Sequence, residues 1–196
     1  MKTIDQIMRK YKGFARMKEL RSEGVQTRDI ASLVKEGVIE KVKPGLYKLV
    51  DYPWDEHESF ADVCNANKNV VICLLSAVSY YELTTFNPSE IYVSVPHNTD
   101  RFFLKYPPIK VYYFIEKYYK PGIQEKETPS GKIRIYNKEK SLGDLFRYIN
   151  KLGEDVALES LKTYMKSRDR DLAKLHEYSV ICGVKDKMEP FIKGML

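Results

Sequence analysis

Side chains that can read DNA bases lie close together between residues 26 and 32 of this sequence. Arg28 can form two hydrogen bonds with guanine, and Gln26 can do the same with adenine. Thr27 and Ser32 add hydroxyl groups that can bond to a base edge or a phosphate. Lysines suited to phosphate contacts flank this cluster at Lys18, Lys35, Lys41, Lys43 and Lys48. These nine residues form the candidate DNA-contacting set.

A short amphipathic helix is predicted to position the base-reading side chains. Thr27 can cap its start, and Gly37 can close its end. At about 100° per residue, apolar and polar positions fall on nearly opposite sides of this helix. The apolar side holds Ile30, Leu33 and Val34, and the polar side holds Arg28, Ser32 and Lys35. One side can therefore pack against a core while the other faces a partner.

A hairpin rich in lysines directly follows this helix. Pro44 and Gly45 suit the second and third positions of a type II turn. Side chains alternate between the two faces of a strand, so apolar residues that point toward the helices would send the lysines to the other face. The apolar set is Val42, Tyr47 and Leu49, and the lysines are Lys41, Lys43 and Lys48. Such a hairpin can lie along a phosphate backbone.

Two further helices are predicted before this stretch. Thr3 and Gln6 have the spacing of a capping box, and an apolar stripe continues to Tyr11. A second short helix fits residues 15–22. Three helices followed by a two-stranded hairpin is the order of a winged helix-turn-helix domain, which we assign to residues 1–52. Small domains of this kind also serve as protein-docking modules, and that alternative stays open here.

The excess positive charge of the chain lies in this same segment. The net charge is +6, and residues 1–50 hold 12 basic and 6 acidic side chains. The remainder holds 21 of each kind and is therefore neutral overall. A basic first quarter joined to a balanced remainder is typical of a nucleic-acid-binding domain attached to a second domain. A solvated basic surface would give the same distribution.

An α+β domain is predicted for residues 58–196. The sequence DYPWDEHE at 51–58 breaks the preceding pattern with a proline and acidic residues, and it marks the boundary. Strands are predicted where β-branched and aromatic residues gather, at 90–96, 109–116 and 132–136. Helices are predicted from apolar spacing at 59–65, 70–85, 139–150, 154–167, 169–182 and 185–195. This domain therefore combines a small sheet with a helical C-terminal half.

The sequence offers little support for catalysis or metal binding. It lacks a glycine-rich phosphate loop, a G-x-S-x-G elbow and an H-E-x-x-H helix. Glu139 and Lys140, which follow a predicted strand, come nearest to a metal-dependent nuclease pattern but fit a helix start better. Cys64, Cys73 and Cys182 have no ligand spacing and are predicted to be buried. We therefore predict a protein that is not an enzyme and needs no metal or cofactor.

Targeting signals and membrane segments are not visible in the sequence. Its longest apolar run falls well short of the roughly 20 residues that a membrane span needs. The first residues, MKTIDQIMRKYKG, alternate charged and apolar side chains and lack the apolar core of a signal peptide. We therefore expect a cytoplasmic protein without a membrane partner.

Tyrosines and lysines are interleaved between residues 110 and 120. The residues concerned are Lys110, Tyr112, Tyr113, Lys117, Tyr118, Tyr119 and Lys120. A mixture of aromatic and basic side chains can bind nucleic acid or an acidic protein surface. Half-buried positions on a strand explain the tyrosines equally well, so both interpretations stay open.

Blocks along nearly the whole chain resemble one known family. They are the N-terminal segment ending in KPGLYKL, followed by VVICLLSAVSYYELTT, EIYVSVP, IRIYNKEKSLGDLFRYINKLGEDVALESLKTYM and LHEYSVICGVKDKMEPFI. In content and order these blocks are similar to the AbiEi antitoxins of type IV toxin–antitoxin systems. The resemblance implies an antitoxin found beside an AbiEii-type nucleotidyltransferase toxin in abortive-infection phage defence.

The resemblance further implies two separate activities. The N-terminal domain would repress its own promoter by binding inverted repeats in double-stranded DNA. The C-terminal domain would counteract the toxin, with or without forming a stable complex. Basic positions of the family's third helix and wing correspond here to Arg28, Lys35, Lys41, Lys43 and Lys48, and Pro44 stands where many relatives have another basic residue.

Two other functions are compatible with the sequence. One is a stand-alone winged-helix transcriptional regulator whose C-terminal domain binds a ligand or another protein. The other is a nuclease that the winged helix targets to DNA and that uses Glu139.

Overall fold

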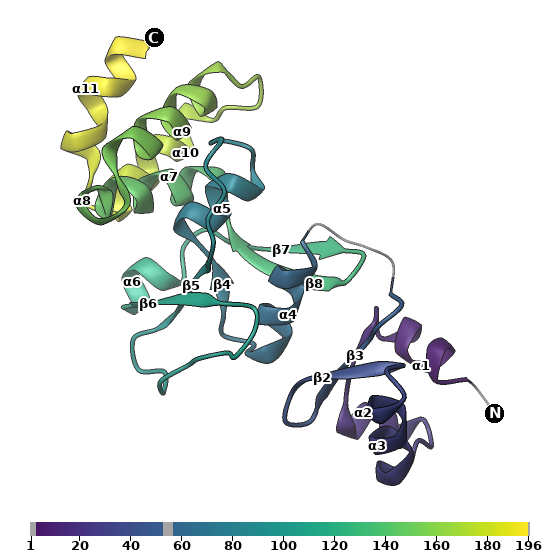
Figure 1. Ribbon diagram of the computed structural model, residues 1–196. Coiled ribbons are helices and arrows are strands. Elements are labelled where there is room, and N and C mark those ends of the chain that lie inside the picture. Colours follow the sequence, from purple (N-terminus) through teal and green to yellow (C-terminus); the bar gives the residue numbers. More distant parts are fainter. Residues whose placement is uncertain (1–2, 53–56, 196) are drawn as a thin grey trace. The chain divides into compact units, whose positions relative to one another are not determined.

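The computed structural model describes residues 3–52 and 57–195 of the chain (Figure 1). The chain divides into two compact units, Met1–Lys68 with Lys126–Ile133, and Asn69–Glu125 with Arg134–Leu196. Residues 53–56, within the predicted boundary, lie outside the described residues. The predicted division into domains 1–52 and 58–196 stays a prediction.

The N-terminal elements form a winged helix-turn-helix. In chain order they are α1 Ile4–Lys10, β1 Phe14–Arg16, α2 Met17–Ser22, α3 Thr27–Lys35, β2 Ile39–Lys43 and β3 Leu46–Leu49. The strands make an antiparallel sheet in the order β1-β3-β2. Its core includes Ile7, Leu20, Ile30 and Tyr47, which join α1, α2, α3 and β3. The predicted fold of this part is confirmed.

The ends of these helices follow the sequence signals only in part. The capping box at Thr3 is confirmed, because the Gln6 N–H donates to Thr3 Oγ1 at 3.3 Å and the Thr3 N–H donates to Gln6 Oε1 at 3.2 Å. The predicted cap at Thr27 is wrong, since Thr27 is the first helical residue and Gln26 holds the N-cap position without a side-chain cap bond. Gly37 follows the end of α3 with φ +73°, as a closing glycine should.

A third strand extends the two-stranded wing that the sequence predicts. Residues 15 and 16, assigned above to a helix, belong to β1 instead. Ala15 pairs with Tyr47 and Arg16 with Leu46, so β1 adds to the free edge of β3. Helix α2 therefore begins at Met17. The physical reason is non-local, because a three-residue strand is fixed by its partner and not by its own pattern.

The remaining elements form an α+β assembly, as predicted. Those around the sheet are α4 Glu58–Ala66, β4 Val71–Ile72, α5 Leu74–Tyr80, β5 Ile91–Pro96, β6 Ile109–Phe114, α6 Glu116–Tyr119, β7 Ile123–Thr128 and β8 Gly131–Tyr136. The five strands lie in the order β6-β5-β4-β8-β7. The sheet is mixed, because β4 runs antiparallel to β5 while the pairs β5–β6 and β4–β8 are parallel.

Five helices follow β8 in the described residues, and each of the four helical segments predicted after residue 138 overlaps at least one of them. They are α7 Lys138–Arg147, α8 Ile149–Leu152, α9 Glu154–Lys166, α10 Leu172–Ile181 and α11 Lys185–Met195. Figure 1 shows them gathered at one end of their unit, in green to yellow. The predicted helix at 70–85 is wrong in its first part, where β4 precedes α5 and Leu74 turns the chain with φ +50°.

A buried charged triad of Lys140, Asp144 and Arg147 lies on α7. The side chains of Lys140 and Asp144 are fully buried and form an ion pair. Arg147 Nη2 lies 3.1 Å from Asp144 Oδ1, so one carboxylate faces two cations. The Arg147 guanidinium also lies 4.0 Å from the centroid of the Tyr118 ring, and Lys140 Nζ lies 4.4 Å from that of Tyr136. Aromatic faces thus complete the surroundings of both cations.

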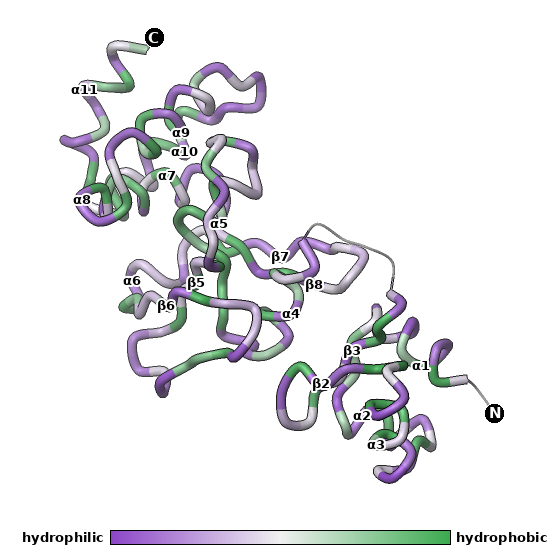
Figure 2. The backbone as a smooth tube through the Cα atoms, viewed as in Figure 1, coloured by the Kyte–Doolittle hydropathy of each residue, from purple (hydrophilic) through white to green (hydrophobic). Residues whose placement is uncertain are grey.

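Hydropathy follows burial in the sheet. Figure 2 shows β4 and β5 mainly in hydrophobic colours and β7 in hydrophilic ones, which fits inner strands and an edge strand. Cys64, Cys73 and Cys182 are buried as predicted, and burial raises the pKa of Cys182 to about 12. Across residues 3–52 and 57–195, no helix has the length and apolar character needed to cross a bilayer.

Candidate nucleic-acid interface

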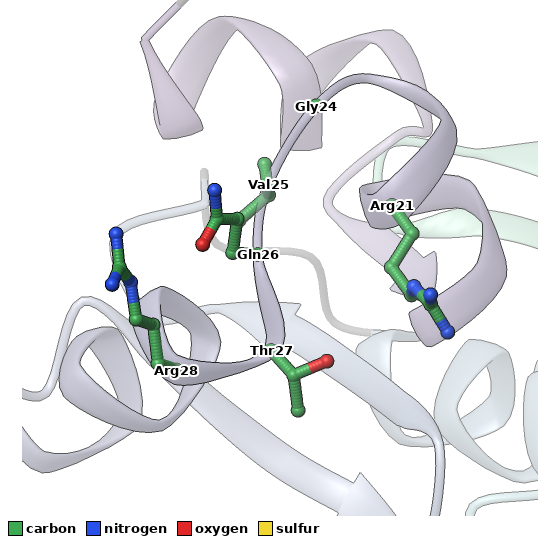
Figure 3. A pocket seen from close by; sticks show the side chains of 6 residues that line it. All are labelled: Arg21, Gly24, Val25, Gln26, Thr27 and Arg28. Atoms are coloured by element: carbon green, nitrogen blue, oxygen red, sulfur yellow. The ribbon is translucent and has the colours of Figure 1, made fainter.

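The turn before α3 exposes a group of polar side chains. Gln26, Thr27 and Arg28 are all exposed, and the Arg28 side chain is 81% accessible. They line an open depression of about 420 Å³ together with Arg21, Gly24 and Val25. Figure 3 shows the Gln26 and Arg28 side chains next to each other on one side of the turn and Arg21 on the other. Three of the base-reading candidates, Gln26, Thr27 and Arg28, therefore share one surface, and Ser32 lies outside it.

The exposed surface of α3 is divided between basic and acidic residues. Lys35 is exposed two turns after Arg28 and, from the helical period, on the same side. The neighbouring strip carries Asp29 and Glu36. Arg28 Nε lies 3.5 Å from Asp29 Oδ1, which is a weak pair at an exposed position and leaves the guanidinium able to bind elsewhere.

Ser32 is less available than the other predicted contacts on α3. Its hydroxyl donates to Glu36 Oε1 at 2.6 Å, so a contact with DNA would have to replace this bond. The carboxylate beside it would also repel a phosphate. Ser32 therefore stays a prediction, and we give it the weakest role in the set.

Helix α2 contributes two basic residues to this side of the unit. Lys18 is exposed, as its predicted phosphate contact requires. Arg21 is also exposed, and it lines the same depression as Gln26 and Arg28. Arg21 is absent from the set predicted from the sequence, although its spacing of three from Lys18 on one helix face is a usable signal.

The wing keeps two of its three predicted lysines near the surface. Lys41 is exposed, and Lys43 is half-buried beside Arg16, where burial and the charge of Arg16 lower the pKa of Lys43. Lys41 pairs with Tyr47 and so shares its face, contrary to the predicted alternation. A register shift between Lys41 and Lys43 causes this difference, because it leaves Val42 unpaired.

Lys48 does not lie on the exposed surface of the wing. It is 9% exposed, its Nζ lies 3.3 Å from Glu40 Oε1, and it forms a closer ion pair with Glu58 of α4. Although burial disfavours its charged form, the surrounding carboxylates of Glu58, Asp62 and Glu40 raise the pKa of Lys48. These contacts argue against the predicted phosphate contact, so we leave Lys48 out of the proposed interface.

Asp62 of α4 completes this cluster around Lys48. It is 7% exposed, and among the described residues its Oδ1 accepts no hydrogen bond. Burial raises the pKa of Asp62 to about 6, against the attraction of Lys48 and with further repulsion from Glu58 and Glu40. The ionised form of Asp62 therefore destabilises the folded state.

Replacement of Asp62 by asparagine is expected to stabilise the protein at neutral pH. Because the folded-state pKa lies above the ordinary 3.8, the folded state binds the proton more tightly, and stability falls as pH rises from about 4 to about 6. Asp62→Asn removes this penalty and should raise the free energy of unfolding at pH 7.5 by roughly 1–3 kcal/mol. Urea unfolding at pH 7.5 and pH 4 measures the difference, which should vanish at pH 4.

The exposed Asp51 offers a matched control, since Asp51→Asn should have little effect at either pH. A less stable Asp62→Asn variant at pH 7.5 would contradict the prediction. It would mean that attraction between Asp62 and Lys48 exceeds the cost of burying the carboxylate.

Glu139, the residue invoked for a nuclease, has a packing role in the structure. It is 7% exposed and accepts a hydrogen bond from Tyr164 Oη at 2.7 Å. Ser76, a buried serine of α5, accepts a hydrogen bond at its Oγ from the Tyr92 N–H at 2.9 Å. These contacts connect helices and strands and do not form an open site.

The three helices, the wing and the exposed polar start of α3 define a winged-helix domain of the transcription-regulator class. Residues 2–50 match the family described as transcriptional regulator, AbiEi antitoxin. The resemblance to AbiEi antitoxins is therefore confirmed for this part of the chain. A search of curated proteins found no significant match.

Proposed function

We propose that the protein is a sequence-specific DNA-binding autorepressor and the antitoxin of a type IV pair. The observation that carries the DNA-binding half is the exposed start of α3, where Gln26, Thr27 and Arg28 stand free of the core. This surface belongs to a segment matched to an antitoxin regulator family. A DNA-binding role also places the protein in the cytoplasm.

In the proposed complex, α3 enters the major groove of the operator. Arg28 reads guanine through a bidentate contact, and Gln26 reads adenine, with Thr27 at a base edge or a phosphate. Lys18 and Lys35 bind phosphates on either side of the groove, with Arg21 beside them. Lys41 and Lys43 of the wing contact the backbone next to the groove. Each half of an inverted repeat would bind one winged helix.

The proposed antitoxin activity belongs to the remainder of the chain, which is not an enzyme in this scheme. Its charges balance, unlike those of the winged helix, so it does not repeat the DNA-binding signature. We propose that it counteracts an AbiEii-type nucleotidyltransferase toxin encoded by the adjacent gene, with or without a stable complex. No metal or cofactor has a part in either activity.

Loss of the wing lysines is expected to weaken all DNA binding uniformly. The double replacement Lys41→Ala with Lys43→Ala removes two phosphate contacts and no base contact, so operator and unrelated DNA should lose affinity alike. The slope of log affinity against log salt should fall in magnitude by about 2. Fluorescence anisotropy with a fragment of the protein's own promoter, titrated at several salt concentrations, measures this slope.

A matched control is the pair Lys162→Ala and Lys166→Ala, exposed lysines on α9 that remove the same charge. This control should leave the slope unchanged. An unchanged slope for the wing variant as well would remove Lys41 and Lys43 from the interface.

Co-expression with the adjacent gene tests the antitoxin activity. The full-length protein should rescue growth from the toxin, and a variant that no longer binds DNA should rescue it equally when expressed from an independent promoter. Promoter binding without rescue would favour the alternative, a stand-alone regulator whose C-terminal domain binds a ligand or another protein.

A further inference from the structure

Two large aromatic side chains protrude from the connection between β5 and β6. We call residues 97–108, which form this connection, the aromatic loop. Phe103 is 76% exposed and Tyr106 is 73% exposed, far more than rings of this size usually are. Each ring leaves a large apolar surface in water, so a partner that covers it would gain binding energy.

The aromatic loop is attached to an edge of the sheet. The Phe102 N–H donates to Tyr113 Oη at 3.3 Å, which joins the loop to the end of β6. Strand β6 is the outermost strand on its side, and Tyr113 and the following Ile115 are 39% and 49% exposed. The loop and the end of β6 therefore present their exposed rings in one region of the unit.

Positive charge surrounds these rings. Residues 97–120 include five basic and two acidic side chains, whereas residues 51–196 as a whole hold equal numbers of the two kinds. Lys120 forms an ion pair with Glu116. The other four, Arg101, Lys105, Lys110 and Lys117, make no ion pair with any residue that the structure describes.

Two of the lysines lie against aromatic rings of the same region. Lys110 Nζ is 5.4 Å from the centroid of the Tyr92 ring, and Lys117 Nζ is 5.5 Å from that of Tyr118. Such contacts hold an ammonium group at the surface without neutralising its charge. The partner that fits this region therefore has both flat apolar groups and many negative charges.

We propose that the aromatic loop and the end of β6 bind single-stranded RNA. Unpaired bases can stack on Phe103 and Tyr106, while Arg101, Lys105 and Lys117 contact the phosphates between them. Double-stranded DNA does not suit this surface, because stacked base pairs hide the faces that a protruding ring needs. An acidic protein would satisfy the lysines but has no regular supply of flat groups for the rings. RNA loops and ends offer both along one strand.

Loss of the rings is expected to weaken RNA binding strongly. The full-length protein is titrated into a fluorescently labelled oligouridine RNA, and binding is followed by anisotropy. Phe103→Ala and Tyr106→Ala should each weaken binding by about tenfold, in line with the usual loss of one stacked base. Tyr106→Phe should retain most of the affinity because it keeps the ring. The pair Arg101→Ala and Lys105→Ala should reduce the salt dependence.

Three controls make the result specific to this surface. Phe86→Ala removes another exposed ring, 45% accessible and outside the aromatic loop, and should leave RNA affinity unchanged. The α9 pair Lys162→Ala and Lys166→Ala should leave the salt dependence unchanged. Arg28→Glu should affect operator binding and not RNA binding, so failure of this proposal and failure of the proposed repressor function are distinguishable.

Several results would overturn the proposal. The first is absence of oligouridine binding, and the second is binding that neither ring replacement weakens. Tighter binding of oligothymidine DNA than of oligouridine would assign the surface to single-stranded DNA instead. Ring-dependent binding of polyglutamate in place of RNA would assign it to an acidic protein. Circular dichroism of each variant should match that of the unmodified protein, since the replaced side chains are exposed.

Discussion

Replacement of Arg28 by glutamate is expected to lower operator affinity by at least about 100-fold. The change removes a bidentate base contact and places a negative charge beside phosphates, and the base contact alone accounts for about 1–3 kcal/mol of discrimination. The Arg28 side chain is 81% accessible, so its replacement should not alter the fold. Fluorescence anisotropy with the promoter fragment, at one fixed salt concentration, measures the loss.

Arg28→Lys separates base reading from simple attraction to DNA. Lysine keeps the charge but lacks the planar fork of arginine, so operator binding should weaken while binding to unrelated DNA changes little. Arg9→Glu is a charge-matched control on α1, at an exposed residue whose present partner is Asp5. Equal operator affinity for Arg28→Glu and the unmodified protein would exclude the start of α3 as the reading surface.

Replacement of Asp144 by alanine is expected to destabilise the chain by about 3–5 kcal/mol. The change leaves the fully buried Lys140 and the largely buried Arg147 without their shared carboxylate, and uncompensated buried charge is among the most costly defects in a core. Guanidinium unfolding followed by far-ultraviolet circular dichroism, which reports mainly on the helices, measures the change in midpoint and slope.

The exposed pair Glu189–Lys193 on α11 provides the comparison. It has the same spacing of four residues as Lys140 and Asp144, and Glu189→Ala should have little effect on the free energy of unfolding because water screens the pair. Asp144→Asn should fall between the two, since it keeps the shape and loses the charge. A loss below about 1 kcal/mol for Asp144→Ala would show that the triad is not a structural necessity.

Local signals in the sequence predict the helices and the order of the N-terminal domain. The capping box at Thr3 and the closing glycine at Gly37 depend only on residues within a turn of the helix end. The rest of the fold therefore does not change their effect. The short strands could not be predicted in this way. The run VVICLLSAV is apolar except for Ser76, and its periodicity does not separate the strand β4 from the helix α5. Strand β7, IQEKET, is too polar to signal a strand.

The candidate interface was predictable to the extent that exposure follows from helical period. Arg28 and Lys35 are exposed because Ile30 is buried on the opposite side of α3. Lys48 could not be excluded from sequence, because the carboxylates that cover it come from β2 and from α4, the latter beyond the winged helix itself. Burial by a distant element leaves no mark on the local pattern.

The contacts of α4 affect where a winged helix of this kind can be recombined with a different C-terminal domain. Besides the pairing of Lys48 with Glu58, Arg16 Nη2 donates to the Asn65 carbonyl at 3.1 Å, so α4 is anchored to two strands of the winged helix. A recombination junction placed after Val50 would take Arg16 and Lys48 from one parent protein and α4 from another. The contacts of Arg16 and Lys48 with α4 would then be lost unless the second parent has the same residues. A junction after Lys68 keeps them together. Evolutionary shuffling and engineered chimeras should therefore tolerate the second junction better than the first.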